Sequence, residues 1–133
     1  MTPDQALQAW LALEHEAVWM YPVVGARVDS LVKSARASFS AHRDTRDALV
    51  GRLRSRGTTP VATALGYDVG PITTSDEARA AAQSLEARIS TAVLNLAGVA
   101  EGTLRTYAVT SLRTSALAEQ TWGSAAKAFP GLP

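Results

Sequence analysis

Residues 7–28, LQAWLALEHEAVWMYPVVGARV, are the stretch that decides the expected fold. Leu7, Glu14, Tyr21 and Val28 lie seven residues apart, and the positions three and four residues after each of the first three are mostly apolar. This spacing is typical of a helix that faces the core of a helical bundle. Glu14 therefore lies in the middle of an apolar seam. Its carboxylate must be paired, neutralised or bound to a cation there, because an isolated buried charge is too costly.

Length and composition narrow the class of protein. A chain of 133 residues can form one domain with its own core, and its abundant alanine favours close-packed helices. The net charge of +1, with mixed signs along the chain, does not indicate a nucleic-acid partner. No apolar run approaches the roughly 18 residues of a membrane span, and no signal peptide is evident. We expect a cytoplasmic protein without a membrane partner.

Four helices are expected from the periodicity and from the start and stop signals. Their approximate ranges are 2–29, 35–56, 75–99 and 103–127. Thr2-Pro3-Asp4-Gln5 provides a capping box at the first start, and Gly57 ends the second helix. Pro22 is expected to kink or widen the first helix. The tail at 129–133, FPGLP, cannot be helical, and its Phe and Leu are expected to pack over the end of the bundle.

Residues 57–75, GTTPVATALGYDVGPITTS, form the one long connection. A helix of 25 residues is about 38 Å long, at about 1.5 Å per residue. Nineteen extended residues reach up to roughly 60 Å, so this segment can run the length of a bundle. The third helix would then run parallel to the second. The expected fold is a single all-α domain over residues 1–133, a four-helix up-down bundle of ferritin-like topology with a long crossover between its second and third helices.

Such bundles can hold a carboxylate-bridged pair of metal ions. One Glu comes from each of the first and third helices, and a Glu-x-x-His pair from each of the other two. Glu14 and Glu86 suit the two single positions. The second helix, however, has His42 where Glu is needed, and the fourth has Arg105. Neither helix has a His three residues further on, so both Glu-x-x-His motifs are absent.

The stretch at 11–17, LALEHEA, followed by Tyr21 and Gly25, resembles the first helix of ferritin-like proteins. The whole chain resembles more specifically the actinobacterial ferritin-like family DUF4439, a domain of unknown function. The residues that carry this resemblance are His42-Arg43-x-x-Arg46-Asp47, Gly57-x-x-Pro60, Leu85-Glu86, Arg105 and the closing Phe129-Pro130-Gly131-Leu132-Pro133. The resemblance implies a ferritin-like fold and brings no established activity.

Two hypotheses for the function follow. In the first, the metal site is degenerate and contains no cofactor, and Glu14 and Glu86 belong to a buried polar network with His42, Arg46 and Arg105. The protein is then a non-catalytic, dimeric binding or scaffold protein. In the second, Glu14, His42 and Glu86 bind one Fe, Mn or Zn ion. The protein is then a metal-dependent oxidoreductase or a metal-storage protein.

The remaining candidates lie on the first helix. His15 and Glu16 point about 100° and 200° away from Glu14 and predict a solvated or dimer-contacting face. A ligand set built on Glu16 would need Pro22 to shift the helical register. Trp19 lies off the apolar stripe and is the candidate for a homodimer surface.

Tyr21 would be a redox tyrosine beside a metal, or otherwise a buried hydroxyl with a hydrogen-bond partner. The spacing of Trp10 and Trp122 favours core positions. No Gly-x-Ser-x-Gly, Walker or Gly-x-Gly-x-x-Gly motif supports a hydrolase or a nucleotide enzyme. The absence of cysteine excludes disulfides, thiolate metal sites and cysteine nucleophiles.

Overall fold

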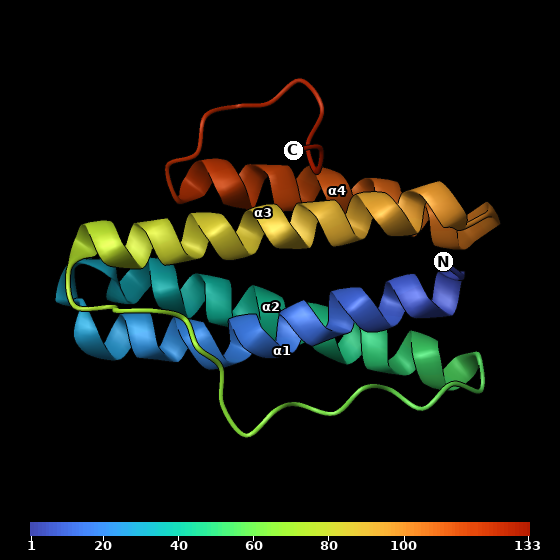
Figure 1. Cartoon of the computed structure of the whole chain (residues 1–133), viewed down its shortest axis with the longest axis horizontal. Coiled ribbons are helices and arrows are strands. Elements are labelled where there is room, and N and C mark those ends of the chain that lie inside the picture. Colours follow the sequence, from blue (N-terminus) through green and yellow to red (C-terminus); the bar gives the residue numbers. More distant parts are fainter.

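The computed structural model describes residues 1–133 as four helices with no strand. They are α1 (Pro3–Arg27), α2 (Val32–Ser55), α3 (Ser75–Val99) and α4 (Gly102–Thr121), with a short 3₁₀ segment, η1 (Asp29–Leu31), between α1 and α2. The helices lie side by side, and α2 and α3 run in the same direction because the crossover returns along the bundle (Figure 1). The predicted all-α four-helix bundle with its long crossover is confirmed. No helix is long and apolar enough to cross a membrane.

Local signals set most of the helix ends. Thr2 and Gln5 form the predicted capping box at the start of α1, and Thr74 and Glu77 form another at the start of α3. Gly57, with a positive φ of 75°, follows the end of α2 as expected.

The fourth helix ends six residues earlier than predicted. Gly123 adopts φ 102°, its N–H donates to the carbonyl of Gln120, and the N–H of Ser124 donates to the carbonyl of Glu119. These two hydrogen bonds form a Schellman motif, which stops the helix after Thr121. The expected continuation to Lys127 was therefore wrong, because a left-handed glycine ended the helix first.

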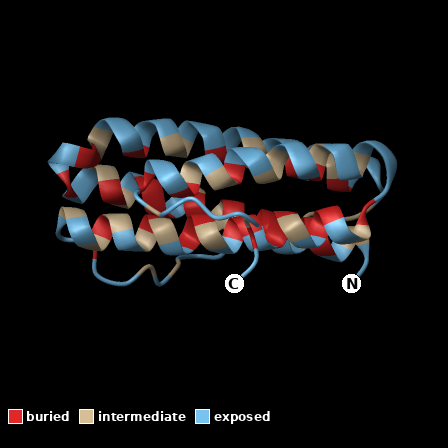
Figure 2. Cartoon of the chain, turned by 90° about the horizontal axis from the view of Figure 1, so that it is seen from above, coloured by how far each residue is buried: buried red, intermediate tan, exposed pale blue.

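The core follows the predicted stripe. Leu7, Glu14, Tyr21 and Val28 are all buried. Trp10 and Trp122 are buried as well and are among the largest side chains of the core. Figure 2 shows the buried residues along the inner sides of the helices, with exposed residues outside. The backbones of the helix pairs α1–α2, α3–α4 and α1–α3 pack closely, whereas those of α2 and α4 come close at few points. The side chain of Arg52 in α2 nevertheless reaches the ring of Tyr107 in α4. The bundle is therefore looser along its α2–α4 side.

The crossover is fastened to the outer face of α1. The side chain of Gln8 donates to the carbonyl of Thr59 at 2.7 Å and accepts from the N–H of Val61 at 2.7 Å. The ring nitrogen Nε2 of His15 lies 3.0 Å from the carbonyl oxygen of Val61. The half-buried His15 thus holds the crossover, which corrects the expectation that it lies on a solvated face.

Trp19 also meets the crossover. Its ring lies edge-on to Tyr67, with ring centroids 6.1 Å apart, and 38 % of the residue stays exposed. The crossover therefore covers part of the surface that Trp19 was expected to offer to a second copy of the chain. The homodimer itself stays a prediction.

The C-terminal tail does not pack its apolar side chains as expected. Phe129 and Leu132 are 73 % and 51 % exposed. The tail is held instead by Gly131, which is buried and whose carbonyl accepts a hydrogen bond from the hydroxyl of Thr91 at 2.8 Å. Only glycine fits at this position, because an added Cβ would lie 2.7 Å from the carbonyl oxygen of Ser90. The expected packing of Phe129 and Leu132 was therefore wrong.

We expect the Gly131→Ala variant to release the tail from α3, so that trypsin cleaves faster after Lys127. Gly57→Ala is the matched control, because Gly57 also has a positive φ but has open space around its Cβ position. The control should lose about 1 kcal/mol of stability from backbone strain, without faster cleavage at Lys127. Equal cleavage rates in wild type and Gly131→Ala would contradict this account of the tail.

Candidate functional site

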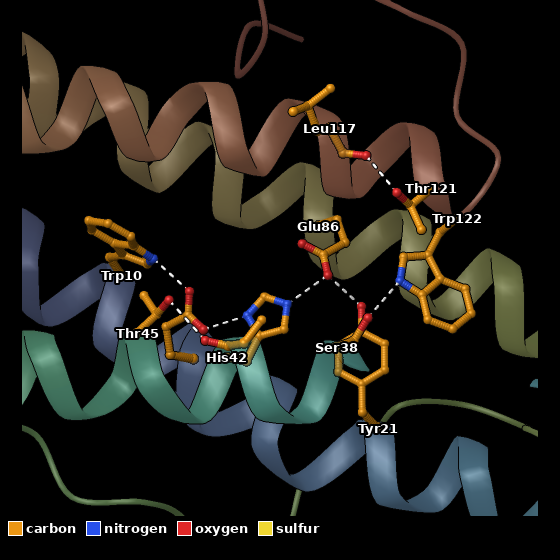
Figure 3. A network of polar contacts seen from close by, with 11 residues as sticks. Trp10, Tyr21, Ser38, His42, Thr45, Glu86, Leu117, Thr121 and Trp122 are labelled. Carbon is orange, nitrogen blue, oxygen red and sulfur yellow. Dashed lines mark hydrogen bonds and ion pairs between the residues drawn. The ribbon is translucent and has the colours of Figure 1, made fainter. Parts of the chain in front are cut away.

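Three helices bring three charged side chains together in the middle of the bundle. We call Glu14 of α1, His42 of α2 and Glu86 of α3 the ion network. Nδ1 of His42 lies 2.6 Å from Oε2 of Glu14, and its Nε2 lies 2.8 Å from Oε1 of Glu86 (Figure 3). All three residues are buried, with 8 % exposure or less. His42 thus lies between two carboxylates that come from opposite sides of its ring.

This geometry determines the charge of His42. A neutral imidazole has one N–H donor and one acceptor, so only the imidazolium can donate to both carboxylates. Burial alone would lower the pKa of His42, but the hydrogen bonds to Glu14 and Glu86 outweigh it and raise the pKa to about 10. His42 is therefore a buried cation at neutral pH.

Two aromatic side chains donate hydrogen bonds to the carboxylates of the ion network. The indole N–H of Trp10 donates to Oε1 of Glu14 at 2.7 Å, and the hydroxyl of Tyr21 donates to Oε1 of Glu86 at 2.5 Å. The ring of Tyr21 also stacks on that of His42, with centroids 5.4 Å apart. Burial, followed by the charge of Glu86, raises the pKa of Tyr21, so the hydroxyl keeps its proton. Of the four carboxylate oxygens, only Oε2 of Glu86 is buried without a partner.

Two arginines that the sequence placed in the network lie outside it. Nη2 of Arg46 contacts Oδ1 of Asp47 at 2.9 Å, on the surface of α2. Arg105 is exposed and lies beside Thr106 and Val109 on the outer side of α4. Because the imidazolium already supplies a cation between the carboxylates, a guanidinium gains nothing there that offsets its loss of water.

Glu16 is also engaged elsewhere. Its carboxylate accepts two hydrogen bonds from Arg88 of α3, at 2.8 and 3.0 Å. Most of its side chain is covered, with 13 % exposed. Glu16 therefore links α1 to α3 near the surface, which corrects the expected solvated face and leaves no ligand set built on this residue.

The residues of the ion network do not fit a metal ion in this arrangement. A histidine ligand binds a metal through the lone pair of a neutral ring nitrogen. Both ring nitrogens of His42 lie at hydrogen-bond distance from carboxylate oxygens, so neither has a free lone pair in this arrangement. No group of three or more His, Asp or Glu side chains in the chain, the ion network included, is arranged so that it could hold a metal ion.

A cavity of about 330 Å³ lies beside the ion network, between α2 and α4. We call it the α2–α4 groove. Half of its 14 lining residues have small side chains, namely Ala41, Thr45 and Ala48 of α2 and Ser111, Thr114, Ser115 and Ala118 of α4. This groove was not predicted from the sequence. The available signal was the helical spacing of small residues on both helices, which leaves space where larger side chains would interlock.

The fold and site define a class, a four-helix bundle with a buried histidinium between two carboxylates. The chain belongs to the family described as Domain of unknown function (DUF4439), which matches residues 6–133. A solved structure similar to it is that of a conserved hypothetical protein, rv2844, from Mycobacterium tuberculosis. The two chains are 27 % identical, 96 % of each is covered, and the TM-score is 0.85. None of the curated proteins matches the chain.

We expect the stability that His42 contributes to fall as the pH rises. The pKa of His42 is raised on folding, so its contribution is fully present below the unfolded pKa of about 6.5 and is lost as the pH rises through the folded pKa of about 10. The loss should be on the order of a few kcal/mol. Urea unfolding at pH 6 to 10 measures it. His42→Gln should show a flatter profile, and an unchanged slope in that variant would contradict the assignment.

We expect Tyr21→Phe to lower the free energy of unfolding by about 2 kcal/mol, because Glu86 loses a buried hydrogen-bond donor. Tyr67→Phe is the control, since the Tyr67 hydroxyl accepts from the N–H of Ala64 and contacts the hydroxyl of Thr63 in the exposed crossover, where water can replace both contacts. The control should lose less than about 1 kcal/mol. Equal losses in chemical denaturation would show that the Tyr21 hydroxyl does not support the ion network.

Proposed function

We propose that this chain is a non-catalytic, ferritin-like binding protein in which a histidinium takes the place of a metal ion. The observation that carries the proposal is the pair of hydrogen bonds from His42 to Glu14 and Glu86, at 2.6 and 2.8 Å. A cation between carboxylates of α1 and α3 does electrostatically what a bound metal ion would do. It balances charges that could not be buried alone.

The topology supports the ferritin-like part of the proposal. One long crossover between the second and third helices distinguishes ferritin-like bundles from bundles with three short loops. Figure 1 shows that arrangement. Glu14 and Glu86 also come from the first and third helices, which provide the single Glu ligands in di-metal bundles. The positions of these carboxylates fit the ferritin-like pattern, while the contributions of α2 and α4 differ from it.

The hydrogen bonds of the polar groups in the site support the proposal that the protein is non-catalytic. A general base needs a free lone pair within reach of a substrate proton. Both nitrogens of His42 donate hydrogen bonds, and both oxygens of Glu14 accept them. Oε2 of Glu86 is the one acceptor of the ion network without a partner, and it is buried away from solvent. The hydroxyls of Ser111 and Thr114 in the groove have no imidazole or carboxylate as a hydrogen-bond partner to activate them as nucleophiles. The groove is thus better suited to binding than to chemistry.

Metal analysis of the purified chain tests the proposal against the metal-binding alternative. We expect Fe, Mn and Zn to be far below stoichiometric. Adding Mn²⁺ or Zn²⁺ at neutral pH should leave the melting temperature unchanged. Glu14→Ala and Glu101→Ala, the latter an exposed carboxylate, serve as a pair. A stoichiometric metal that is lost in Glu14→Ala and kept in Glu101→Ala would overturn the proposal.

A further inference from the structure

The charged side chains around the α2–α4 groove are mostly acidic. Glu14, Asp44 and Glu86 line it together with His42, and no Lys or Arg does. With His42 as an imidazolium, three carboxylates face one cation. Carboxylates in a partly enclosed site interact more strongly with a ligand charge than they would in water, because the effective dielectric constant is lower. The negative charge around the groove therefore favours the binding of a cation.

One acceptor in this lining lacks a partner. Oε2 of Glu86 is buried and accepts no hydrogen bond. In Figure 3 this oxygen points away from Tyr21, whose hydroxyl bonds to the other oxygen of Glu86. A buried acceptor without a donor is unfavourable by about 1–3 kcal/mol, and more for a charged group. A ligand that donates an N–H to this oxygen would remove that penalty.

The shape of the groove favours an elongated ligand. It extends along α4 from Tyr107 to Ala118, which corresponds to about 16 Å at 1.5 Å per residue. Small side chains on both walls leave room for a methylene chain. At one end the rings of Tyr107 and Trp10 stack, with centroids 5.6 Å apart. Arg52 already covers the Tyr107 ring at 3.7 Å, so the ligand cation is drawn to the carboxylates rather than to that ring.

We propose that the α2–α4 groove binds a linear aliphatic amine, with an ammonium group donating to Glu86 and the methylene chain lying between α2 and α4. This inference rests on the proposed function, because a metal ion among these carboxylates would cancel the negative charge that attracts an amine. Oε2 of Glu86 is covered in the ligand-free chain, so the groove must widen locally. Widening is possible here because the backbones of α2 and α4 come close at few points.

Isothermal titration calorimetry on the full chain tests this with butylamine, putrescine and spermidine, and with 1-pentanol as a neutral ligand of similar shape. We expect saturable one-to-one binding of at least one amine and none of 1-pentanol. Glu86→Gln should weaken binding about tenfold or more, because a charge-assisted hydrogen bond is lost. Ser111→Leu, which fills the groove without altering the ion network, should abolish binding. Glu101→Gln, the matched control on an exposed carboxylate, should bind as wild type does.

The inference is overturned if no amine binds, if 1-pentanol binds equally well, or if Ser111→Leu binds as wild type does. Should Glu86→Gln fail to fold, Ser111→Leu and 1-pentanol still decide the question. Parallel titrations with Mn²⁺ and Zn²⁺ separate the two proposals. Stoichiometric metal binding overturns the proposed function, whereas the failure of amines and metals alike overturns only this inference.

Discussion

A positive charge held between two buried carboxylates is the interaction on which the interior of this bundle depends. Glu14 and Glu86 come from different helices, and each would be strongly unfavourable if buried alone. His42 gives both a charge-assisted hydrogen bond and so links α1, α2 and α3 at one level. Removing one member of such a network costs about 3–5 kcal/mol in typical proteins, since it leaves an uncompensated charge. The network therefore fixes the register of three helices as well as their stability.

The fourth helix is attached differently. It contributes no charged side chain to the ion network, and it faces α2 with small residues such as Ser111 and Ser115. Large side chains would have interlocked and closed the bundle on this side. The same small residues that make the α2–α4 contact weak also leave the acidic groove open. The looser side of the bundle and its candidate binding site are thus one feature with one cause.

Much of the fold could be predicted from local signals and periodicity. The seven-residue spacing of Leu7, Glu14 and Tyr21 identified the inner face of α1, and the length of the crossover identified the parallel α2–α3 pair. The partner of Glu14 was harder to predict. His42 and Arg46 lie four residues apart, on the same side of α2. Only the rotation of α2 about its axis and its position along that axis decide which of them meets the carboxylate of Glu14. These depend on packing across the whole bundle.

The contacts that were not predicted have related causes. The contacts of His15 and Trp19 with the crossover were missed because the crossover has no periodic pattern that shows which helix it follows. The position of the tail depends on Gly131 fitting against the backbone of α3, a contact between distant parts of the chain. Both are long-range contacts of irregular segments. Propensity and periodicity describe regular segments and carry no information about such contacts.

The division of the ion network between the two helix pairs has a consequence for the order of assembly. His42 is separated from Glu14 by 28 residues and from Glu86 by 44, across the crossover. Contacts within the α1–α2 hairpin close a shorter loop and so form at a lower entropic cost. The ion pair of Glu14 and His42, whose net charge is zero, can thus form in that hairpin before α3 docks. The carboxylate of Glu86 then binds to the histidinium when α3 docks. The two hairpins therefore meet in the register that places Glu86 beside His42.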